Sequence, residues 1–311
     1  MARELNRARI ALFMVTALAG CGLLFLPFTK LVLDRGPISG ILPSLLFIFG
    51  LGVYLHKRGM LVLRGLMEVL GCAVVISYAG IVWSYVAISL DHPLADTYLI
   101  ALDRSIGFDW LSFVAVIDRI PWLDSALFAA YQSFMYQLLV IPLFLVASGL
   151  AVRGYMLVAG FGLLCMAASV ISVWFPAVGA HVALAVDPAS LKHLNPHFGY
   201  AFLDQFHSVR NDTTFLLTMN KAAGILTFPS VHAGAAFLCG WAAWKSKILR
   251  FPVGFLNIAM AMSAISHGSH YLVDVIAGIL LSASIVLILD GLVSPSIRFR
   301  LFRYLSASGI R

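Results

Sequence analysis

Charged residues are scarce in this 311-residue chain: they make up 11% of it, against 61% for hydrophobic residues. Soluble domains carry about 25% charged residues, so this composition excludes an ordinary soluble domain. Cysteine is also rare, and the four that occur all lie within apolar runs, as Cys21, Cys72, Cys165 and Cys239. We expect them to pack as small buried hydrophobic side chains and not to form disulfides or bind a metal.

The chain contains several long apolar runs. Several reach the roughly 18–20 residues that cross a hydrocarbon core, which predicts an all-α, polytopic helical membrane protein with a single domain over residues 1–311. We expect eight spans, at residues 10–28, 37–55, 65–90, 125–150, 154–175, 229–244, 252–266 and 271–292. Residues 91–122 mix apolar and charged side chains, as interfacial helices do, and residues 176–228 form a long polar loop before the sixth span.

Basic residues indicate how these spans are oriented. With the N-terminus in the cytoplasm, every inside connector is basic and most of the 21 lysines and arginines lie on that side. The positive-inside rule therefore predicts that both termini are cytoplasmic. The net charge of +7 follows from these connectors and does not indicate a nucleic-acid partner. We expect the protein in a bacterial inner membrane.

Two stretches place histidines where a polar segment becomes an apolar run. One contains Pro229-Ser230-Val231-His232, and the other contains His270-Tyr271-Leu272-Val273-Asp274. Spans six and eight both run inward from the outer face in the predicted topology, so both helix N-termini lie there. Their N–H groups are expected to form an anion site, with Thr227 or Ser230 as the cap of the sixth span.

The residue types at these two borders suit phosphoryl transfer. His270 and Asp274 are four residues apart and so share a helix face. The carboxylate can accept the N–H of one ring nitrogen, which leaves the other nitrogen free to attack phosphorus. His232 would then act as the general acid for the leaving oxygen. No cofactor is required for this chemistry.

Further polar residues near these borders are candidates for substrate binding. Arg210 and Lys221 are the nearest cations upstream of His232, Ser230 precedes it, and His267 lies three residues before His270. His267 has a loop-capping role as an equal alternative. His193 and His197 have the spacing of a metal pair, but Pro196 between them breaks a regular helix, so we expect no metal site.

The two histidine stretches resemble the second and third motifs of the type-2 phosphatidic acid phosphatase superfamily, over roughly residues 90–290. The version here is similar to the branch of the inositol phosphorylceramide synthases, whose second motif is Pro-Ser-Leu-His and whose third ends His-Tyr-x-x-x-Asp. The segment from Asp96 to Trp110 and Phe175-Pro176-Ala177 resemble that branch less specifically. The resemblance implies that His270 is the nucleophile, Asp274 its orienting carboxylate and His232 the acid/base.

The chain departs from the superfamily in its cations. It lacks the first motif, a lysine followed by Arg-Pro, and it has Ala264 near the position of the third-motif arginine. Related sequences often have a basic residue after the Phe-Pro of the fifth span, where this chain offers only His181. His181 is therefore a further candidate for binding the substrate.

These patterns predict an enzyme that acts on lipid phosphoesters through a phosphohistidine. An alcohol acceptor would make it a phosphotransferase of the inositol phosphorylceramide type, and water would make it a lipid phosphatase; the branch resemblance favours transfer. The competing class is a non-catalytic transporter or lipid-binding scaffold. A transporter is expected to have polar residues at midplane depth, whereas this chain gathers its ionisable groups at one face.

Overall fold

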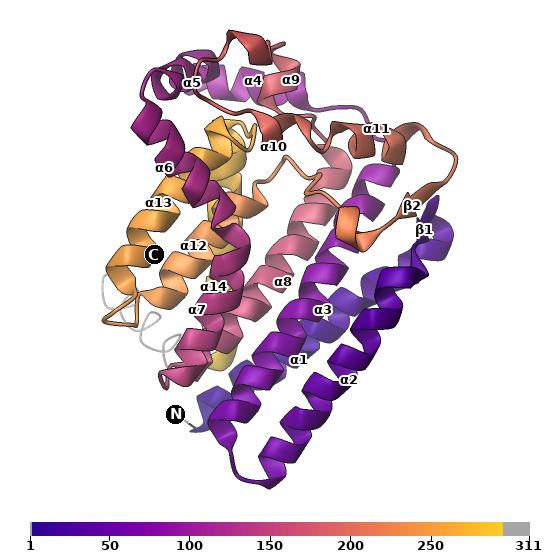
Figure 1. The fold of residues 1–311 in the computed structure, drawn as a ribbon, viewed down its shortest axis with the longest axis vertical. Helices are drawn as coiled ribbons and strands as arrows, with labels where there is room; N and C mark the ends of the chain where they lie inside the picture. Colours follow the sequence, from indigo (N-terminus) through magenta and orange to yellow (C-terminus); the bar gives the residue numbers. More distant parts are fainter. Residues whose placement is uncertain (1, 295–311) are drawn as a thin grey trace, which may run out of the picture.

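The structure, a computed structural model, describes residues 2–294. Its long helices run roughly along the longest axis of the molecule, and short helices lie across one end, here named the capped end (Figure 1). The long helices are α1 (Ala2–Gly20), α2 (Arg35–Lys57), α3 (Leu61–Ser89), α6 (Pro121–Gln132), α7 (Phe134–Ala147), α8 (Ala151–Trp174), α12 (Val231–Ala243), α13 (Arg250–Ser266) and α14 (Leu272–Val293). The capped end is covered by α4 (Asp96–Ser105), α5 (Trp110–Asp118), α9 (Ala180–Ala183), α10 (His197–Tyr200) and α11 (Leu203–Asn211).

Within residues 2–294, five helices are long and apolar enough to cross a membrane: α1 with its continuation η1 (Cys21–Phe28), α2, α3, α8 and α14. A sixth span results if α6 and α7 count as one. The prediction of a polytopic helical membrane protein is therefore confirmed. The count of eight is not, because α12 and α13 have only 13 and 17 residues.

The predicted fourth span is not a single straight helix. It breaks at Ser133 into α6 and α7, whose axes differ by 57°. The interfacial segment that precedes it forms two helices, α4 and α5, which lie across the capped end (Figure 1). Gly107, with a φ of 77°, lies in the turn between them, a conformation that glycine adopts without strain.

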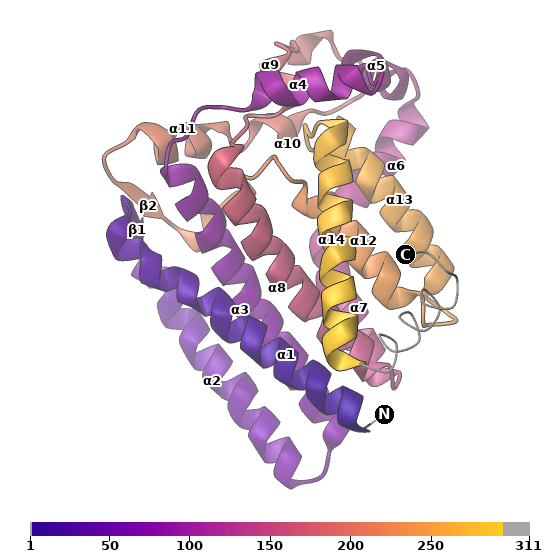
Figure 2. The ribbon, with the colours of Figure 1, turned by 180° about the vertical axis from the view of Figure 1, so that it is seen from behind.

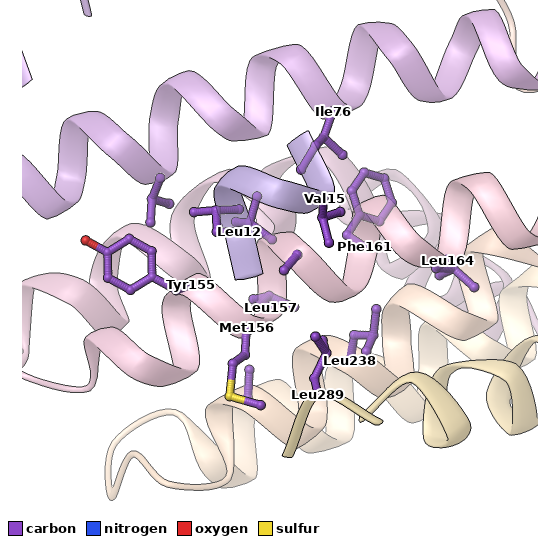
Figure 3. Packing of buried hydrophobic residues seen from close by; sticks show 14 of the residues in the cluster. Leu12, Val15, Ile76, Tyr155, Met156, Leu157, Phe161, Leu164, Leu238 and Leu289 are labelled. Atoms are coloured by element: carbon purple, nitrogen blue, oxygen red, sulfur yellow. The ribbon is translucent and has the colours of Figure 1, made fainter. Parts of the chain in front are cut away.

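The main hydrophobic core surrounds α8, which packs against α1, α3, α7, α12 and α14. Figure 3 shows Leu157 and Phe161 of α8 among side chains from α1, α3 and α14. Burial of α8 explains why this helix is apolar on every side, as a helix at the centre of a bundle has to be. Of the four cysteines, all unpaired, Cys72, Cys165 and Cys239 are buried as expected, whereas Cys21 is exposed.

The uncapped end holds the start of α1 and the end of α14 side by side, since Ser294 Oγ donates a hydrogen bond to Glu4 Oε1 at 2.9 Å. Near the same end, Glu68 of α3 accepts hydrogen bonds from Arg9 and Arg64 at 2.8 and 2.7 Å. Both ends of the described chain therefore lie opposite to the cap (Figure 2). The last residues of the sequence, 295–311, are rich in arginine and fall outside the described residues 2–294.

Two short strands join the first outer connection to the long polar loop, which the sequence did not predict. β1 (Leu31–Leu33) pairs in parallel with β2 (Phe215–Leu217), and Leu31 is the partner of Phe215. The same loop contains two single turns of 3₁₀ helix, η2 (Pro188–Ser190) and η3 (Met219–Lys221). The loop thus folds back over the capped end and returns to the start of α12.

Candidate active site

His270 and Asp274 form a hydrogen-bonded pair at the capped end of α14. His270 Nδ1 lies 3.3 Å from Asp274 Oδ2, and the same oxygen accepts the backbone N–H of Tyr271 at 2.9 Å. Both side chains are buried, His270 to 3% exposure and Asp274 to 0%. Because Nδ1 faces the carboxylate, Nε2 is the nitrogen left for chemistry, and it has no hydrogen-bond partner among residues 2–294.

Contacts from the cap hold the segment between α13 and α14 in place. Trp110 Nε1 donates to the carbonyl of His270 at 3.0 Å. The Tyr271 hydroxyl donates to Asp96 Oδ1 at 2.8 Å. The Asp96 carboxylate in turn accepts the N–H groups of Val178 and Gly179, at 3.1 and 3.0 Å. The nucleophile candidate is therefore positioned by α4, α5 and the segment after α8.

Asp103 occupies the N-terminus of α14. Its carboxylate accepts the backbone N–H groups of Leu272 and Val273, both at 2.9 Å. The expectation of two open helix N-termini in one anion site is therefore wrong for α14, since a side-chain anion is already bound there. Burial in the cap raises the pKa of Asp103, although the two backbone N–H groups oppose that rise.

The N-terminus of α12 is different. Ser230 Oγ accepts the N–H of Ala233 at 3.3 Å, so Ser230 is the cap and Thr227 is not. Thr227 Oγ1 instead donates to the carbonyl of Ala177 at 2.8 Å. The backbone N–H groups of Val231 and His232 have no acceptor among the described residues. One helix N-terminus thus remains able to receive an anion.

His232 lies in the first turn of α12, facing the break between α6 and α7. Its ring is stacked on Tyr131, with centroids 4.4 Å apart and planes 12° apart, and it lies 4.3 Å from the ring of Phe134. The bend at Ser133 is what brings these two aromatic rings onto one imidazole. The centroid of His232 is 6.3 Å from that of His270.

Close packing of α12 against α14 fixes this separation. Ser230 N–H donates to the carbonyl of Asp274 at 3.0 Å, which ties the two helix starts together. Gly278 of α14 faces the carbonyl of Ser230 so closely that a Cβ atom there would collide with it. The glycine is therefore required for the approach of the two helices.

A cavity of about 390 Å³ contains both imidazoles. Most of its walls are apolar or aromatic, contributed by α3, α7, α8 and residues 222–226. Polar groups include the hydroxyls of Ser77, Ser84, Tyr131 and Thr227. No lysine or arginine is among the described residues that line it. The cavity therefore suits a largely apolar molecule whose polar part reaches His232 and His270.

The remaining predicted binding residues lie outside this cavity. His267 is fully buried, with Nε2 3.1 Å from Asp124 Oδ1 and Nδ1 3.0 Å from Ser266 Oγ. Arg210 pairs with Asp91 at 2.7 Å and donates to the carbonyl of His92 at 2.8 Å. Lys221 is exposed next to the cavity wall formed by residues 222–226. Of these three side chains, that of Lys221 has no hydrogen-bond or ion-pair partner among residues 2–294.

His181 lies beneath the cap, at the position predicted to replace a basic residue. Its ring packs edge-on against Trp110, with centroids 4.8 Å apart, and neither ring nitrogen has a hydrogen-bond partner in the described part of the chain. Its burial, together with the nearby charge of His267, lowers the pKa of His181 to about 4. His181 is therefore neutral at physiological pH and presents no cation.

Sequence reasoning missed the residues that support the site. Asp96 and Asp103 fall in the segment expected to be interfacial, and Asp124 was given no role, yet they are 7%, 3% and 8% exposed. Asp118 also belongs to this set, because it accepts the N–H groups of Lys192, His193 and Leu194. No signal in the neighbouring sequence marks their burial, because their partners are remote in the chain. Within residues 2–294 no group of three potential ligands could hold a metal ion.

Comparison with known proteins places the chain in a family. The family model of the PAP2 superfamily matches residues 97–288, from α4 to the last turns of α14. The chain therefore belongs to the PAP2 superfamily, whose members are generally phosphatases or phosphotransferases that act on lipid phosphoesters. No curated protein and no solved structure matches the chain.

Proposed function

We propose that the protein is an integral-membrane phosphotransferase that moves a phosphoryl group or phospho-headgroup from one lipid to an alcohol acceptor, as inositol phosphorylceramide synthases do. The observation that carries this proposal is the shared cavity: His232 and His270 line it together, and Asp274 holds Nδ1 of His270. We assign the catalytic core to residues 90–290. Its active site lies at the outer face of a bacterial inner membrane, with both termini in the cytoplasm.

His270 is the nucleophile in this mechanism. Its Nε2 attacks phosphorus while the bond from phosphorus to the leaving oxygen breaks, and His232 donates a proton to that oxygen. The product is a phosphohistidine, and Asp274 stabilises the positive charge on the ring. The acceptor hydroxyl then gives its proton to His232 and attacks phosphorus, which releases neutral His270.

The distance between the two rings supports one phosphorus centre between them. An attacking atom lies about 3–3.5 Å from its target, and a proton donor about 2.6–3.2 Å from the atom that it protonates. With the bond from phosphorus to oxygen added, the straight path is longer than the 6.3 Å between the ring centroids, and a bend at the leaving oxygen brings its two ends within reach of both rings. The N–H groups of Val231 and His232 are the donors nearest to the phosphoryl oxygens in this arrangement.

The charge of the cavity favours a diester as the donor lipid. A phosphate monoester carries up to two negative charges, and none of the described cavity residues is a lysine or arginine that would balance them. A phosphodiester carries one charge, for which the free backbone N–H groups of Val231 and His232 at the start of α12 are donors. Because an uncompensated charge in an apolar site is costly, transfer of a phospho-headgroup from a diester fits this cavity better than hydrolysis of a monoester.

The test is to trap the intermediate. Purified protein is incubated with a phosphodiester lipid that carries a labelled headgroup phosphate, with and without a lipid alcohol, and quenched under alkaline conditions. We expect label on the wild type and on a His207→Ala control, an exposed histidine of α11, and no label on His270→Ala. Turnover that persists in folded His270→Ala would overturn the histidine mechanism and favour a different class of protein.

The acceptor is identified in the same experiment. We expect the labelled intermediate to persist without an acceptor and to decay when the lipid alcohol is added, with the label recovered in a new lipid. Rapid release of the labelled group into water without the alcohol would make the protein a hydrolase that uses water as its acceptor.

A further inference from the structure

A second cavity follows a different face of α12 from the one that carries His232. It measures about 610 Å³ and forms a groove between α13 and α14, with α12 as its floor. Figure 2 shows α12 between these two helices, which both pack along it and contact each other much less. Small side chains form much of the floor and one wall: Ala233, Ala236, Gly240, Gly254 and Ala261.

One end of this groove is cationic, and it is the end away from the cap. Arg153, at the start of α8, and Lys245, just after α12, both line it. The Arg153 guanidinium lies 3.9 Å from the centre of the Trp241 ring, and its Nη1 is buried without a hydrogen-bond partner among the described residues. Asp290 lies close enough to interact with both cations, so these three groups leave one net positive charge.

The groove is long enough for the acyl chain of a lipid in one leaflet. It extends from Ala233 to Lys245, which is about 18 Å along a helix at 1.5 Å per residue. Half of a hydrocarbon core is about 15 Å thick. The exposed Trp244 stands at the cationic end, where aromatic side chains commonly mark the level of the headgroups.

We propose that this groove binds one anionic phospholipid of the leaflet opposite to the active site. An acyl chain lies along the small side chains of α12 and α13, and the phosphate lies between Arg153 and Lys245. The net charge of +1 complements a single phosphodiester, whereas the quaternary ammonium of a zwitterionic lipid would face the same cations and is disfavoured. This site is separate from the cavity of His232 and His270 and does not depend on the reaction assigned to it.

The experiment compares two lipids with identical acyl chains. Delipidated protein in detergent receives phosphatidylglycerol or phosphatidylcholine, and native mass spectrometry measures how much of each lipid is retained. We expect one tightly retained phosphatidylglycerol, and about 5-fold weaker retention in Lys245→Gln, because each basic residue near a membrane surface contributes about 1 kcal/mol. Lys57→Gln, an exposed lysine of α2 outside the groove, serves as the control. Arg153→Gln is expected to show the same loss of retention. If Arg153→Gln does not fold, the result for Lys245→Gln is sufficient to test the site.

A second pair of variants tests the groove itself. A Cβ atom at Gly240 or at Gly50 of α2 would meet no atom within 4 Å, so both positions have space at the backbone for a side chain. Gly240→Leu fills the groove and is expected to abolish retention of phosphatidylglycerol, whereas Gly50→Leu leaves it unchanged. Equal retention of both lipids by the wild type, or full retention by Gly240→Leu, would overturn the proposal. A wild-type dimer that dissociates in Gly240→Leu would also overturn the proposal, since a second copy of the chain would then occupy the groove.

Discussion

Replacing Asp274 by asparagine tests how the carboxylate acts on His270. Asp274 Oδ2 accepts from both His270 Nδ1 and the backbone N–H of Tyr271, and the second donor cannot change its role. We therefore expect the amide oxygen of asparagine to take the place of Oδ2, with Nδ1 of His270 still protonated and Nε2 still free to attack. The substitution then removes the negative charge and keeps the tautomer.

The size of the effect follows from this geometry. A hydrogen bond to a charged group contributes about 1.5–3 kcal/mol, which corresponds to about 10- to 150-fold in rate. The contact of 3.3 Å is longer than the about 2.7–2.9 Å typical of charge-assisted bonds, which favours the lower half of that range. A wrong tautomer in a comparable triad costs about 10⁴-fold.

The assay is the single-turnover rate of phosphohistidine formation, with Asp204→Asn as the control, because Asp204 is exposed on α11. Asp274 Oδ1 is buried without a described partner, so the amide nitrogen placed there should also cost about 1–3 kcal/mol of stability. A rate loss near 10⁴-fold would refute the argued orientation of the amide. An unchanged rate would refute the orienting role of Asp274 itself.

Three further substitutions test the supports of the site. Gly278→Ala should destabilise the protein by about 1–3 kcal/mol, because its Cβ atom clashes with the Ser230 carbonyl. Gly291→Ala, in open space on the same helix, should stabilise the protein by up to about 1 kcal/mol. Equal thermal unfolding midpoints of the two variants would contradict this. Asp103→Asn should lower stability by about 1–2 kcal/mol, as loss of a helix-capping side chain does. It should also slow phosphohistidine formation, because His270 adjoins the start of α14. Unchanged stability and an unchanged rate would show that Asp103 supports neither the helix nor the site. The pKa of His181 in the folded protein is about 4, below its ordinary value of 6.5. As the pH falls, His181 is therefore protonated in the unfolded chain before it is protonated in the folded protein. This lowers the free energy of unfolding by about 2 kcal/mol between pH 8 and pH 5. His181→Phe, which loses no hydrogen bond, should abolish that part of the drop in unfolding midpoint, and an unaltered drop would show that other groups cause it.

The sequence was sufficient for the helical class of the fold and for the pair of His270 and Asp274. Both are local features: a long apolar run predicts a span, and residues four apart on a helix meet. The break at Ser133 was not predicted, although Gln132, Ser133 and Gln137 make this stretch more polar than the rest of the span. Its cause lies elsewhere in the chain, since Tyr131 and Phe134 on either side of the break both pack on His232.

The carboxylates of the cap were misjudged for a related reason. An aspartate in an amphipathic segment is expected to face water, and the partners that bury these residues are remote in the sequence. Asp103 lies 169 residues before Leu272, and Asp124 lies 143 residues before His267. Because the favourable interaction that allows burial comes from the tertiary fold, composition and periodicity around each aspartate carry no sign of it.

Asp103 also changes how the proposed reaction has to work. Had both helix N-termini been open, a phosphate between them would have been held equally by α12 and α14. The carboxylate of Asp103 instead fills the N-terminus of α14 and would repel a second anion there, while Val231 and His232 keep their N–H groups without a described acceptor. Under the proposed mechanism the phosphoryl oxygens therefore lie towards α12, and His270 approaches phosphorus from the α14 side. Such an arrangement keeps the group that binds the anion apart from the group that attacks phosphorus, so the bound oxygens do not block the approach of His270.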